Sequence, residues 1–135
     1  MANVSIRLLP PETLMAFLSR TPPPVACLAI ESSMWLVRGA SPAPIDDGLA
    51  VDVGDAYAQF AIDGCGAAEL LGCGMSLDFE RLAPDFVGRA RLGEIAVIVE
   101  RTETGFVLLC ERSYVEYLSV WLEHAASFSP SPVDI

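Results

Sequence analysis

The sequence has 135 residues, of which 53% are hydrophobic, and it is long enough for one domain with a buried core. Eighteen acidic residues stand against eight basic residues, all of them arginine, which gives a formal net charge of −10. This charge disfavours nucleic acids and anionic membranes as partners, and the lack of lysine excludes Walker-type phosphate binding and Schiff-base chemistry. The apolar excess predicts that a partner protein covers part of the surface.

The N-terminal region and the cysteines predict a cytoplasmic location. The short apolar stretch around Leu14–Leu18 follows Pro10, Pro11 and Glu12, and no basic region precedes a long apolar one, so a secretory signal is not expected. No apolar run approaches the ~20 residues that a membrane span requires. The cysteines lie apart without CxxC spacing, which predicts four free, buried thiols. They are Cys27, Cys65, Cys73 and Cys110.

The first predicted element is a short N-terminal helix. Pro11 is tolerated in the first turn of a helix, where its missing N–H would have no partner. A helix is therefore expected from Glu12 to about Ser19. The prolines Pro22–Pro24 end it and form an extended spacer.

Strands are expected next. Val25–Ile30 and Met34–Val37 are apolar segments that can pair as a hairpin across a short polar interruption. The turn-forming residues of Arg38–Gly48 predict a loop. A second strand pair is expected at Leu49–Val53 and Tyr57–Ile62, which a Gly-Asp dipeptide separates.

Two further helices follow these strands. Asp63 is a candidate N-cap for a helix that starts near Gly64 or Gly66 and ends at Gly72 and Gly74. Near the C-terminus, a serine and a glutamate in S-x-x-E spacing predict a capping box and a final amphipathic helix. The box is Ser113 and Glu116, and the apolar stripe is Tyr114, Leu118, Trp121, Leu122 and Ala125.

Between the two later helices, three apolar segments predict an antiparallel meander. They are Phe86–Leu92, Glu94–Glu100 and Phe106–Glu111, and Ile95–Val99 is apolar on both faces and is expected inside the sheet. The pattern predicts a single α+β domain over residues 1–135, with a mostly antiparallel sheet and two to three helices. Residues 1–24 form the N-terminal helix and spacer, residues 25–127 the α+β core, and residues 128–135 a disordered tail.

No group of residues has the pattern of a catalytic, cofactor or metal site. Gly64–Gly66 lies between a strand and a helix, but Glu69 stands where a dinucleotide loop has its third glycine, so a tight turn is expected. His124, the single histidine, is expected to be solvated or to contact a partner. Cys65 and Cys73 lack a second pair for zinc. Asp46, Asp47, Asp52 and Asp55 lack EF-hand spacing and predict a solvated acidic loop.

Several short motifs resemble known families. Val51–Gly64 followed by Ala67–Leu71 resembles the opening block of the aminomethyltransferase (glycine-cleavage T protein) superfamily, with Gly54-Asp55 where that family usually has Ser-His. A more specific set resembles the gamma subunit family of heterotetrameric sarcosine oxidases, and the match covers about residues 49–124. That set comprises Gly72–Phe79, Arg89–Gly93, Phe106–Leu109, Arg112–Tyr114 and Trp121-Leu122.

The resemblance implies the fold of the first aminomethyltransferase domain and a role as a non-catalytic structural or assembly subunit. The complex would be a bacterial, sarcosine-oxidase-like flavoenzyme of one-carbon metabolism that oxidatively demethylates a secondary or N-methylated amine. Alpha, beta and delta subunits are the implied partners, and FAD, FMN, NAD and tetrahydrofolate are expected on them. No cofactor and no small-molecule substrate is expected on this chain, because Leu92–Ala96 replaces the superfamily's acidic Gly-Gly-Ile-x-Asp-Asp type block.

Two alternatives stay open. The chain could be a small folate-binding protein of C1 transfer that uses Glu94 or Asp63 to hold the pterin. It could also be a free-standing ligand-binding or regulatory domain of the same fold. The two differ from the subunit hypothesis in requiring a ligand on this chain.

The candidate partner-interface residues lie in three places. Leu14 and Phe17 belong to the apolar N-terminal segment, and Cys73 and Met75 belong to the glycine-rich turn. Tyr117 lies off the apolar stripe of the final helix. Tyrosine buries a large area at low entropic cost, which favours it as an interface anchor.

Overall fold

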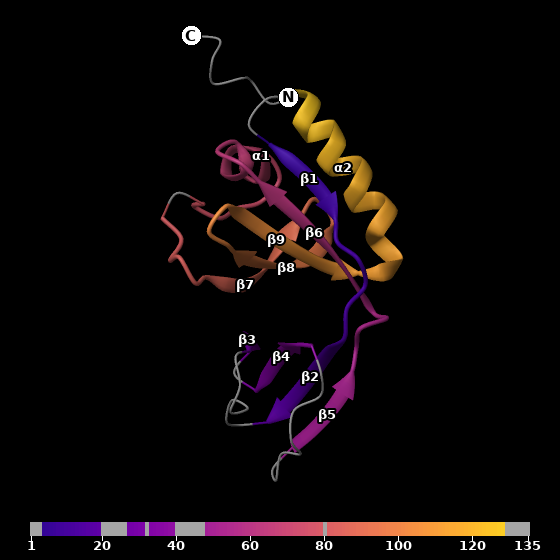
Figure 1. Cartoon of the computed structure of the whole chain (residues 1–135). Coiled ribbons are helices and arrows are strands. Elements are labelled where there is room, and N and C mark those ends of the chain that lie inside the picture. The colour runs from indigo at the N-terminus through magenta and orange to yellow at the C-terminus, as the bar shows by residue number, and fades with distance from the viewer. Residues whose placement is uncertain (1–3, 20–26, 32, 40–47, 80, 129–135) are drawn as a thin grey trace.

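The computed structural model describes residues 4–19, 27–31, 33–39, 48–79 and 81–128. Within these ranges the chain forms two antiparallel sheets, two α-helices and one 3-10 turn (Figure 1). The predicted α+β class and the mostly antiparallel pairing are therefore confirmed. No helix in the described ranges has the length and hydropathy needed to cross a membrane.

The larger sheet has five strands in the order β1-β6-β9-β8-β7, and every neighbouring pair is antiparallel. The strands are β1 (Ser5–Leu8), β6 (Tyr57–Asp63), β7 (Val87–Leu92), β8 (Ile95–Arg101) and β9 (Gly105–Glu111). The meander predicted from the sequence is β7, β8 and β9. As expected from its apolar faces, β8 lies inside the sheet, between β7 and β9.

Helices cover one face of this sheet. They are α1 (Ala67–Gly72), the 3-10 turn η1 (Arg112–Tyr114) and α2 (Val115–Phe128). Because side chains alternate along a strand, Val97, Val99 and Leu108 all point to this face and pack with Leu118 and Leu122 of α2. The resulting core is apolar throughout.

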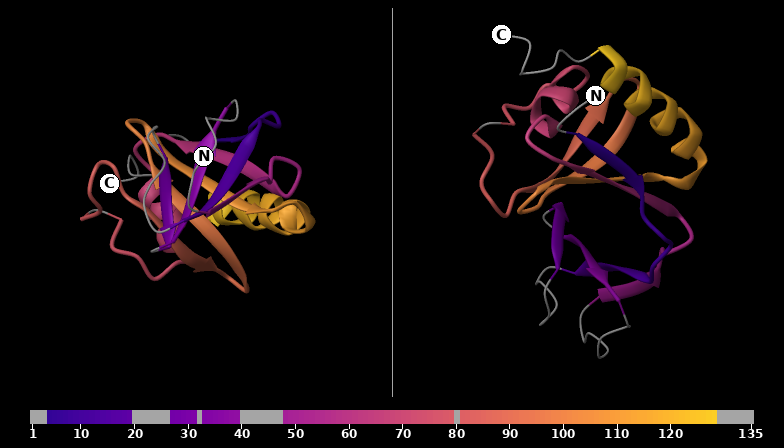
Figure 2. Two further views of the ribbon diagram at one scale, coloured as in Figure 1. Left: turned by 90° about the horizontal axis from the view of Figure 1, so that it is seen from below. Right: turned by 45° about the horizontal axis from the view of Figure 1, so that its top comes forward.

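A four-stranded sheet covers the other face. Its order is β3-β4-β2-β5, with β2 (Leu14–Ser19), β3 (Leu28–Glu31), β4 (Met34–Arg38) and β5 (Gly48–Asp52). The predicted hairpin is β3 and β4. Ile98 and Leu109 of the large sheet pack with Leu14 and Leu36 of the small one. The chain thus has three layers, helices, sheet and sheet, which Figure 2 shows from two further directions.

The predicted helix from Glu12 to Ser19 is wrong, because this segment is strand β2. It lies between β4 and β5, with Leu14 opposite Arg38 and Ala16 opposite Val51. A five-residue apolar run is too short for periodicity to distinguish a helix from a strand. Its pairing partners lie far along the chain, so tertiary contacts decide its structure. The N-terminal segment is accordingly part of both sheets, since β1 belongs to the larger one.

The predicted pairing of Leu49–Val53 with Tyr57–Ile62 is also wrong. Both strands exist, but β5 pairs with β2 while β6 pairs with β1 and β9. The chain changes sheets between them, beside the crossing from β1 to β2, where the Val53 N–H donates to the Leu14 carbonyl at 2.8 Å. A Cβ on Gly54 would lie 2.8 Å from the Glu12 carbonyl oxygen, so this close approach requires glycine.

The two predicted helix caps are not formed as expected. Gly66, not Asp63, is the N-cap of α1, and no side-chain cap hydrogen bond is made there. The Asp63 carboxylate instead accepts from Thr104 Oγ1 at 2.7 Å and pairs with Arg7 at 3.2 Å. Ser113 lies inside η1, whose N-cap is Glu111, again without a side-chain cap hydrogen bond.

Some predictions fall on segments outside the described residues. These are the proline spacer, the start of the first predicted hairpin strand, most of the loop after Arg38 and the tail from residue 129. Helix α2 continues to Phe128, one residue into the segment predicted as tail.

Candidate functional site

Three of the five predicted interface residues are already covered by the chain itself. Leu14 and Phe17 are each 1% exposed, because β2 is a central strand of the small sheet and both of its faces are packed. Leu14 joins the core between the sheets, and Phe17 packs with Met15 and Val37 on the opposite face. Met75 is 6% exposed and belongs to the core beneath the helices. The prediction that these three side chains contact a partner is therefore corrected.

Cys73 and Tyr117 are exposed and stay candidates for a partner contact. A Cβ on Gly74 would overlap the Trp121 ring, and one on Gly93 would lie 2.6 Å from Tyr117 Oη. The Gly93 N–H donates to the Gly74 carbonyl at 3.3 Å. Two glycines thus allow the aromatic rings of α2 to lie directly on the turns at residues 72–75 and 93.

We call Gly74, Gly93, Tyr117 and Trp121 the aromatic platform. The Glu94 N–H donates to Tyr117 Oη at 3.4 Å, which ties the ring to the β7–β8 turn. The sequence indicated Tyr117 and the glycine-rich turn separately, and the structure brings them to one surface. Two glycines, Gly74 and Gly93, each leave room for an aromatic ring, and Tyr117 and Trp121 are four residues apart on one face of α2. This combination is the sequence feature that could have linked the two regions.

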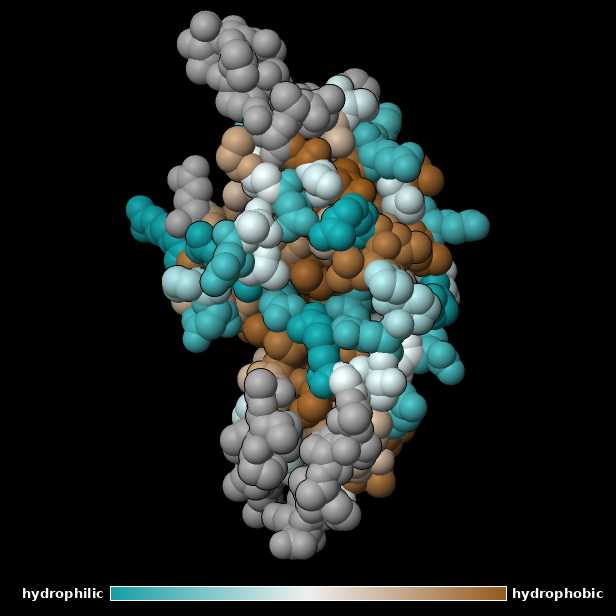
Figure 3. Space-filling view, in the orientation of Figure 1, coloured by the Kyte–Doolittle hydropathy of each residue, from teal (hydrophilic) through white to brown (hydrophobic). Residues whose placement is uncertain are grey.

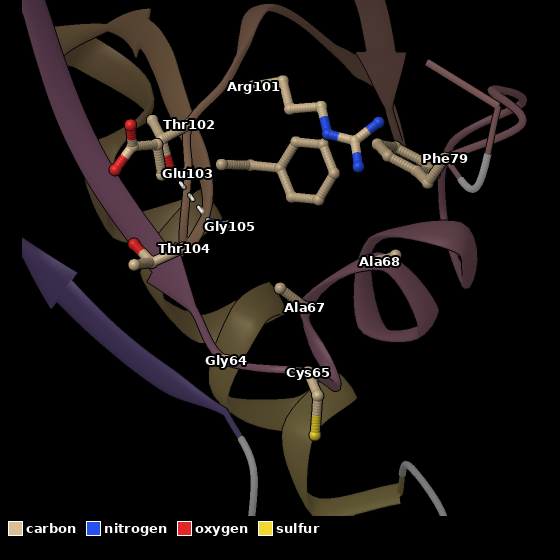
Figure 4. A pocket seen from close by; sticks show the side chains of 11 residues that line it. Gly64, Cys65, Ala67, Ala68, Phe79, Arg101, Thr102, Glu103, Thr104 and Gly105 are labelled. Carbon is tan, nitrogen blue, oxygen red and sulfur yellow. Dashed lines mark hydrogen bonds between the residues drawn. The ribbon is translucent and has the colours of Figure 1, made fainter. Parts of the chain in front are cut away.

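A hollow of about 670 Å³ lies between the start of α1, Phe79 and the β8–β9 turn (Figure 4). Gly64 has a φ of 111°, and its carbonyl accepts from the Ala67 N–H at 3.1 Å, so the segment Gly64–Gly66 is the tight turn that the sequence predicted. Arg101 points toward Phe79 and donates to the Leu82 carbonyl. The lining of the hollow therefore includes a guanidinium group and the aromatic rings of Phe79 and Phe106.

The carboxylate of Asp63 contacts Thr104, which is one of the residues that line this hollow. The Asp63 carboxylate accepts hydrogen bonds from Thr104 in the β8–β9 turn and from Arg7 in β1. It therefore links strand β6 to β1 and to that turn. Glu94 lies in the β7–β8 turn, where its N–H contacts Tyr117. The two residues proposed to hold a pterin therefore lie at different places, and Asp63 has a structural role.

A polar cluster connects the two sheets. Arg38, at the end of β4, donates to Glu12 at 2.9 Å and to Gln59 at 2.9 Å and pairs with Glu100 at 2.6 Å. The Gln59 amide also donates to Glu12 at 2.6 Å. We call these four residues the inter-sheet polar cluster. Burial opposes the charge of Arg38, but the hydrogen bonds and negative charges of Glu100 and Glu12 outweigh it and raise its pKa.

All four cysteines are unpaired, but they differ in burial. Cys110 is buried beneath the helices, and that burial raises the pKa of its thiol to about 11. Burial also raises the pKa of Cys27. Cys65 and Cys73 are exposed, so the prediction that every thiol is buried is wrong for these two. Each lies in a turn that flanks α1.

The remaining predicted site residues have simple surroundings. Among the described residues, no three His, Cys, Asp or Glu side chains are grouped to hold a metal ion. Asp52 accepts from the Gly54 N–H at 2.9 Å, while Asp46 and Asp47 lie outside the described ranges. His124 is exposed on α2, and its carbonyl accepts from Ser127 Oγ at 2.7 Å.

Exposed apolar side chains occur at two places in particular. The first is the edge of the small sheet, where Leu18, Leu49 and Val51 are 44%, 57% and 41% exposed. Brown, apolar surface reaches the outside at this edge in Figure 3. The second is α2, where Tyr117 and Val120 are 39% and 65% exposed. These surfaces are the strongest candidates for contact with another protein.

Comparison with solved structures finds a chain of similar fold in a multisubunit enzyme. This is the heterotetrameric sarcosine oxidase from Corynebacterium sp. U-96 in complex with pyrrole 2-carboxylate. The TM-score is 0.80 with 17% sequence identity, and the match covers 96% of this chain and 87% of that chain. No protein-family model and no curated protein sequence matches the chain. The likeness confirms an α+β fold similar to that of a sarcosine oxidase chain.

Proposed function

We propose that the chain is a non-catalytic assembly subunit of a sarcosine-oxidase-like flavoenzyme that oxidatively demethylates a secondary or N-methylated amine. The observation that carries this proposal is the likeness to a chain of a heterotetrameric sarcosine oxidase over 96% of the length. In this proposal the chain corresponds to the gamma subunit. The alpha, beta and delta subunits are its partners, and they hold FAD, FMN, NAD and tetrahydrofolate.

The surface of the chain supports a subunit role. In the described part of the chain, seven large apolar or aromatic side chains are exposed, among them Leu49, at 57%, and Val120, at 65%. Exposed apolar area of this kind is covered when subunits associate. The carboxylate of Asp63, a candidate for holding a pterin, instead contacts Thr104 and Arg7 of this chain.

Co-expression with genes for flavin-binding subunits encoded beside it tests the proposal. We expect the chain to co-purify with them in a fixed ratio, and we expect amine oxidation by the complex to fall when the chain is omitted. Ultraviolet-visible spectra should show flavin in the complex and not in the chain alone. A chain that ignores these subunits, or that oxidises an amine by itself, would contradict the proposal.

One observation favours a second candidate function, that of a ligand-binding domain. The hollow beside α1 has a volume of about 670 Å³, within the range of small-molecule sites, and Arg101 could bind an anionic group there. Titration of the isolated chain with tetrahydrofolate, followed by calorimetry, distinguishes the two functions. Saturable binding that Arg101→Leu removes would favour the ligand-binding domain, and no binding is expected for an assembly subunit.

A further inference from the structure

The four strands at the sheet edges are protected to different degrees. Exposed edges usually carry charges, bulges or prolines that prevent pairing with other chains. Edge strand β7 carries Arg89 and Arg91, β1 carries Arg7 paired with Asp63, and the register of β3 is irregular before Glu31. Strand β5 has the sequence Gly-Leu-Ala-Val-Asp and lacks such a device along its middle. It is the least protected edge in the described part of the chain.

Strand β5 also presents apolar side chains that this chain leaves uncovered. Leu49 is opposite Leu18, and Val51 is opposite Ala16, so all four side chains lie on one face of the small sheet. Ala16 belongs to the core between the sheets. The apolar wall of that core therefore continues outward to Leu18, Leu49 and Val51, which are 41–57% exposed. All five residues of β5 are exposed.

The backbone of β5 is available for one more strand. The Val53 N–H points to β2, because it donates to the Leu14 carbonyl. Since backbone direction alternates along a strand, the N–H groups of Leu49 and Val51 also point to β2, while those of Ala50 and Asp52 point to the free edge. Among the described residues, β5 has β2 as its strand neighbour and no strand on the other side.

The charge around β5 indicates the kind of partner. Between Arg38 and Arg81 the sequence has no basic residue, β5 ends at Asp52, and Asp46-Asp47 and Asp55 lie close before and after the strand in the sequence. Two copies of the chain joined at this edge would each carry a net charge of −10, and this like charge opposes their association. A segment with basic residues on both sides is instead attracted to the edge.

We propose that the outer edge of β5 binds an extended segment of a partner subunit, which adds a strand to the small sheet. The segment has apolar residues at alternate positions, which cover Leu49 and Val51, and basic residues at its flanks. Its backbone pairs with the outward N–H and C=O groups of Ala50 and Asp52. Addition of a strand to an open sheet edge is a common form of peptide recognition. This inference rests on the proposed function, because it specifies how the subunit binds its partner.

Substitutions at one position test the inference in the assembled complex. Ala50→Pro removes an outward N–H and leaves the hydrogen bonds from β5 to β2, because proline is tolerated where an edge N–H faces solvent. We expect it to weaken binding to the flavin-binding subunits by at least about tenfold. Ala50→Ser keeps the N–H and should bind as the unsubstituted chain does. Circular dichroism of the free variants monitors folding.

A second variant keeps the test valid if the proline disturbs the strand. Leu49→Lys leaves the backbone unchanged, places a charge on the apolar wall and repels basic flanks, so it should also weaken binding by at least about tenfold. Ala83→Lys places the same charge on an exposed turn outside β5 and α2 and should leave binding unchanged, while Val120→Lys tests the exposed surface of α2. Weakened binding of Val120→Lys with normal binding of both β5 variants would move the interface to α2 and overturn the inference.

A measurement on the free chain separates this inference from the proposed function. The probe is a synthetic peptide of alternating valine and threonine flanked by lysines, compared with the same peptide flanked by glutamates. We expect the lysine-flanked peptide to shift the amide resonances of Ala50 and Asp52 and to lose binding on Ala50→Pro and at high salt. Equal shifts with both peptides, an unaffected Ala50→Pro variant, or dimers of the chain joined through β5 would overturn the inference.

Discussion

The two faces of the five-stranded sheet are covered in different ways. Toward the helices, Val99 and Leu108 pack with Leu118 and Leu122 in a core that is fully apolar, and all four side chains have no exposed area. Toward the small sheet, the covering comprises an apolar centre at Leu109, the inter-sheet polar cluster and an apolar wall at β5 that stays exposed. The first covering is complete within this chain, while the second is incomplete.

The difference indicates what each layer contributes. Apolar burial is strong but non-directional, so the helices supply stability. The polar cluster uses hydrogen bonds of defined geometry, so we infer that it fixes how the small sheet sits on the large one. A sheet that is held in a defined position and keeps the apolar side chains of β5 exposed is suited to bind another protein. The following substitutions test whether the helix layer supplies stability and the polar cluster supplies orientation.

The largest effect is expected in the helix-covered core. Leu122→Ala removes a fully buried side chain and should lower the free energy of unfolding by about 2–5 kcal/mol, through lost burial and a cavity. Val120→Ala, two residues earlier on α2 at a side chain that is 65% exposed, should change it by less than about 0.5 kcal/mol. Urea denaturation measures both. Similar losses for the two variants would show that this layer is not the main source of stability.

Cys110 gives the same core a dependence on pH. Its pKa is raised from 9.0 to about 11 in the folded chain, so the folded state keeps a proton that the unfolded state loses. Stability from this group is complete below about pH 9 and is lost as the pH rises toward 11, by about 2–3 kcal/mol in all. Urea denaturation at several pH values measures the slope. Cys110→Ala should flatten it, and an unchanged slope would assign the dependence to other groups.

The polar cluster should contribute less, because its side chains are partly exposed. Arg38→Met leaves Glu12, Gln59 and Glu100 without their shared donor and should cost about 1–2 kcal/mol. Arg81→Met removes a cation that is 88% exposed and pairs with Asp78.

Arg81→Met should therefore change the free energy of unfolding by less than about 0.5 kcal/mol. Thermal unfolding of Arg38→Met and Arg81→Met compares the two effects. Hydrogen exchange should show that Arg38→Met exposes amides of the small sheet more than those of the large one. Uniform exchange would argue against a role in joining the sheets.

The smallest effect is expected at the aromatic platform. Gly74→Ala places a methyl group against the Trp121 ring, which must move, at a cost of about 1 kcal/mol. At Gly72, a Cβ would meet nothing within 4 Å, so Gly72→Ala should be neutral or stabilising.

Tryptophan fluorescence should change in Gly74→Ala and not in Gly72→Ala. In a Trp121→Ala background the cost of Gly74→Ala should disappear, as a double-mutant cycle would show. A cost that persists there would have its origin in the backbone of the turn.

Local patterns in the sequence were sufficient for the elements that pair with near neighbours. The meander from β7 to β9 follows from three apolar segments separated by turns, and α1 and α2 start close to where glycines and polar residues predicted. The tight turn at Gly64 and the free thiols also agree with the sequence. Each of these features depends on residues within about one turn or hairpin of each other.

The candidate site was predicted only in part. Cys73 and Tyr117 are exposed as an interface requires, but Leu14, Phe17 and Met75 are buried. The exposed residues of β5 and the polar cluster were missed, because exposure of Leu49 or contact of Arg38 with Glu100 depends on how the sheets pack. A sequence pattern shows which side chains are apolar and not which of them the rest of the chain covers.

The sequence by itself determined the α+β class, the antiparallel meander and the acidic, lysine-free character of the chain, because these depend on composition and short-range alternation. Only the tertiary structure decided that residues 14–19 form a strand, that β5 and β6 belong to different sheets and that β5 is an open edge. The physical reason is that an apolar run gains burial equally well in a helix or a strand, so long-range pairing makes the choice.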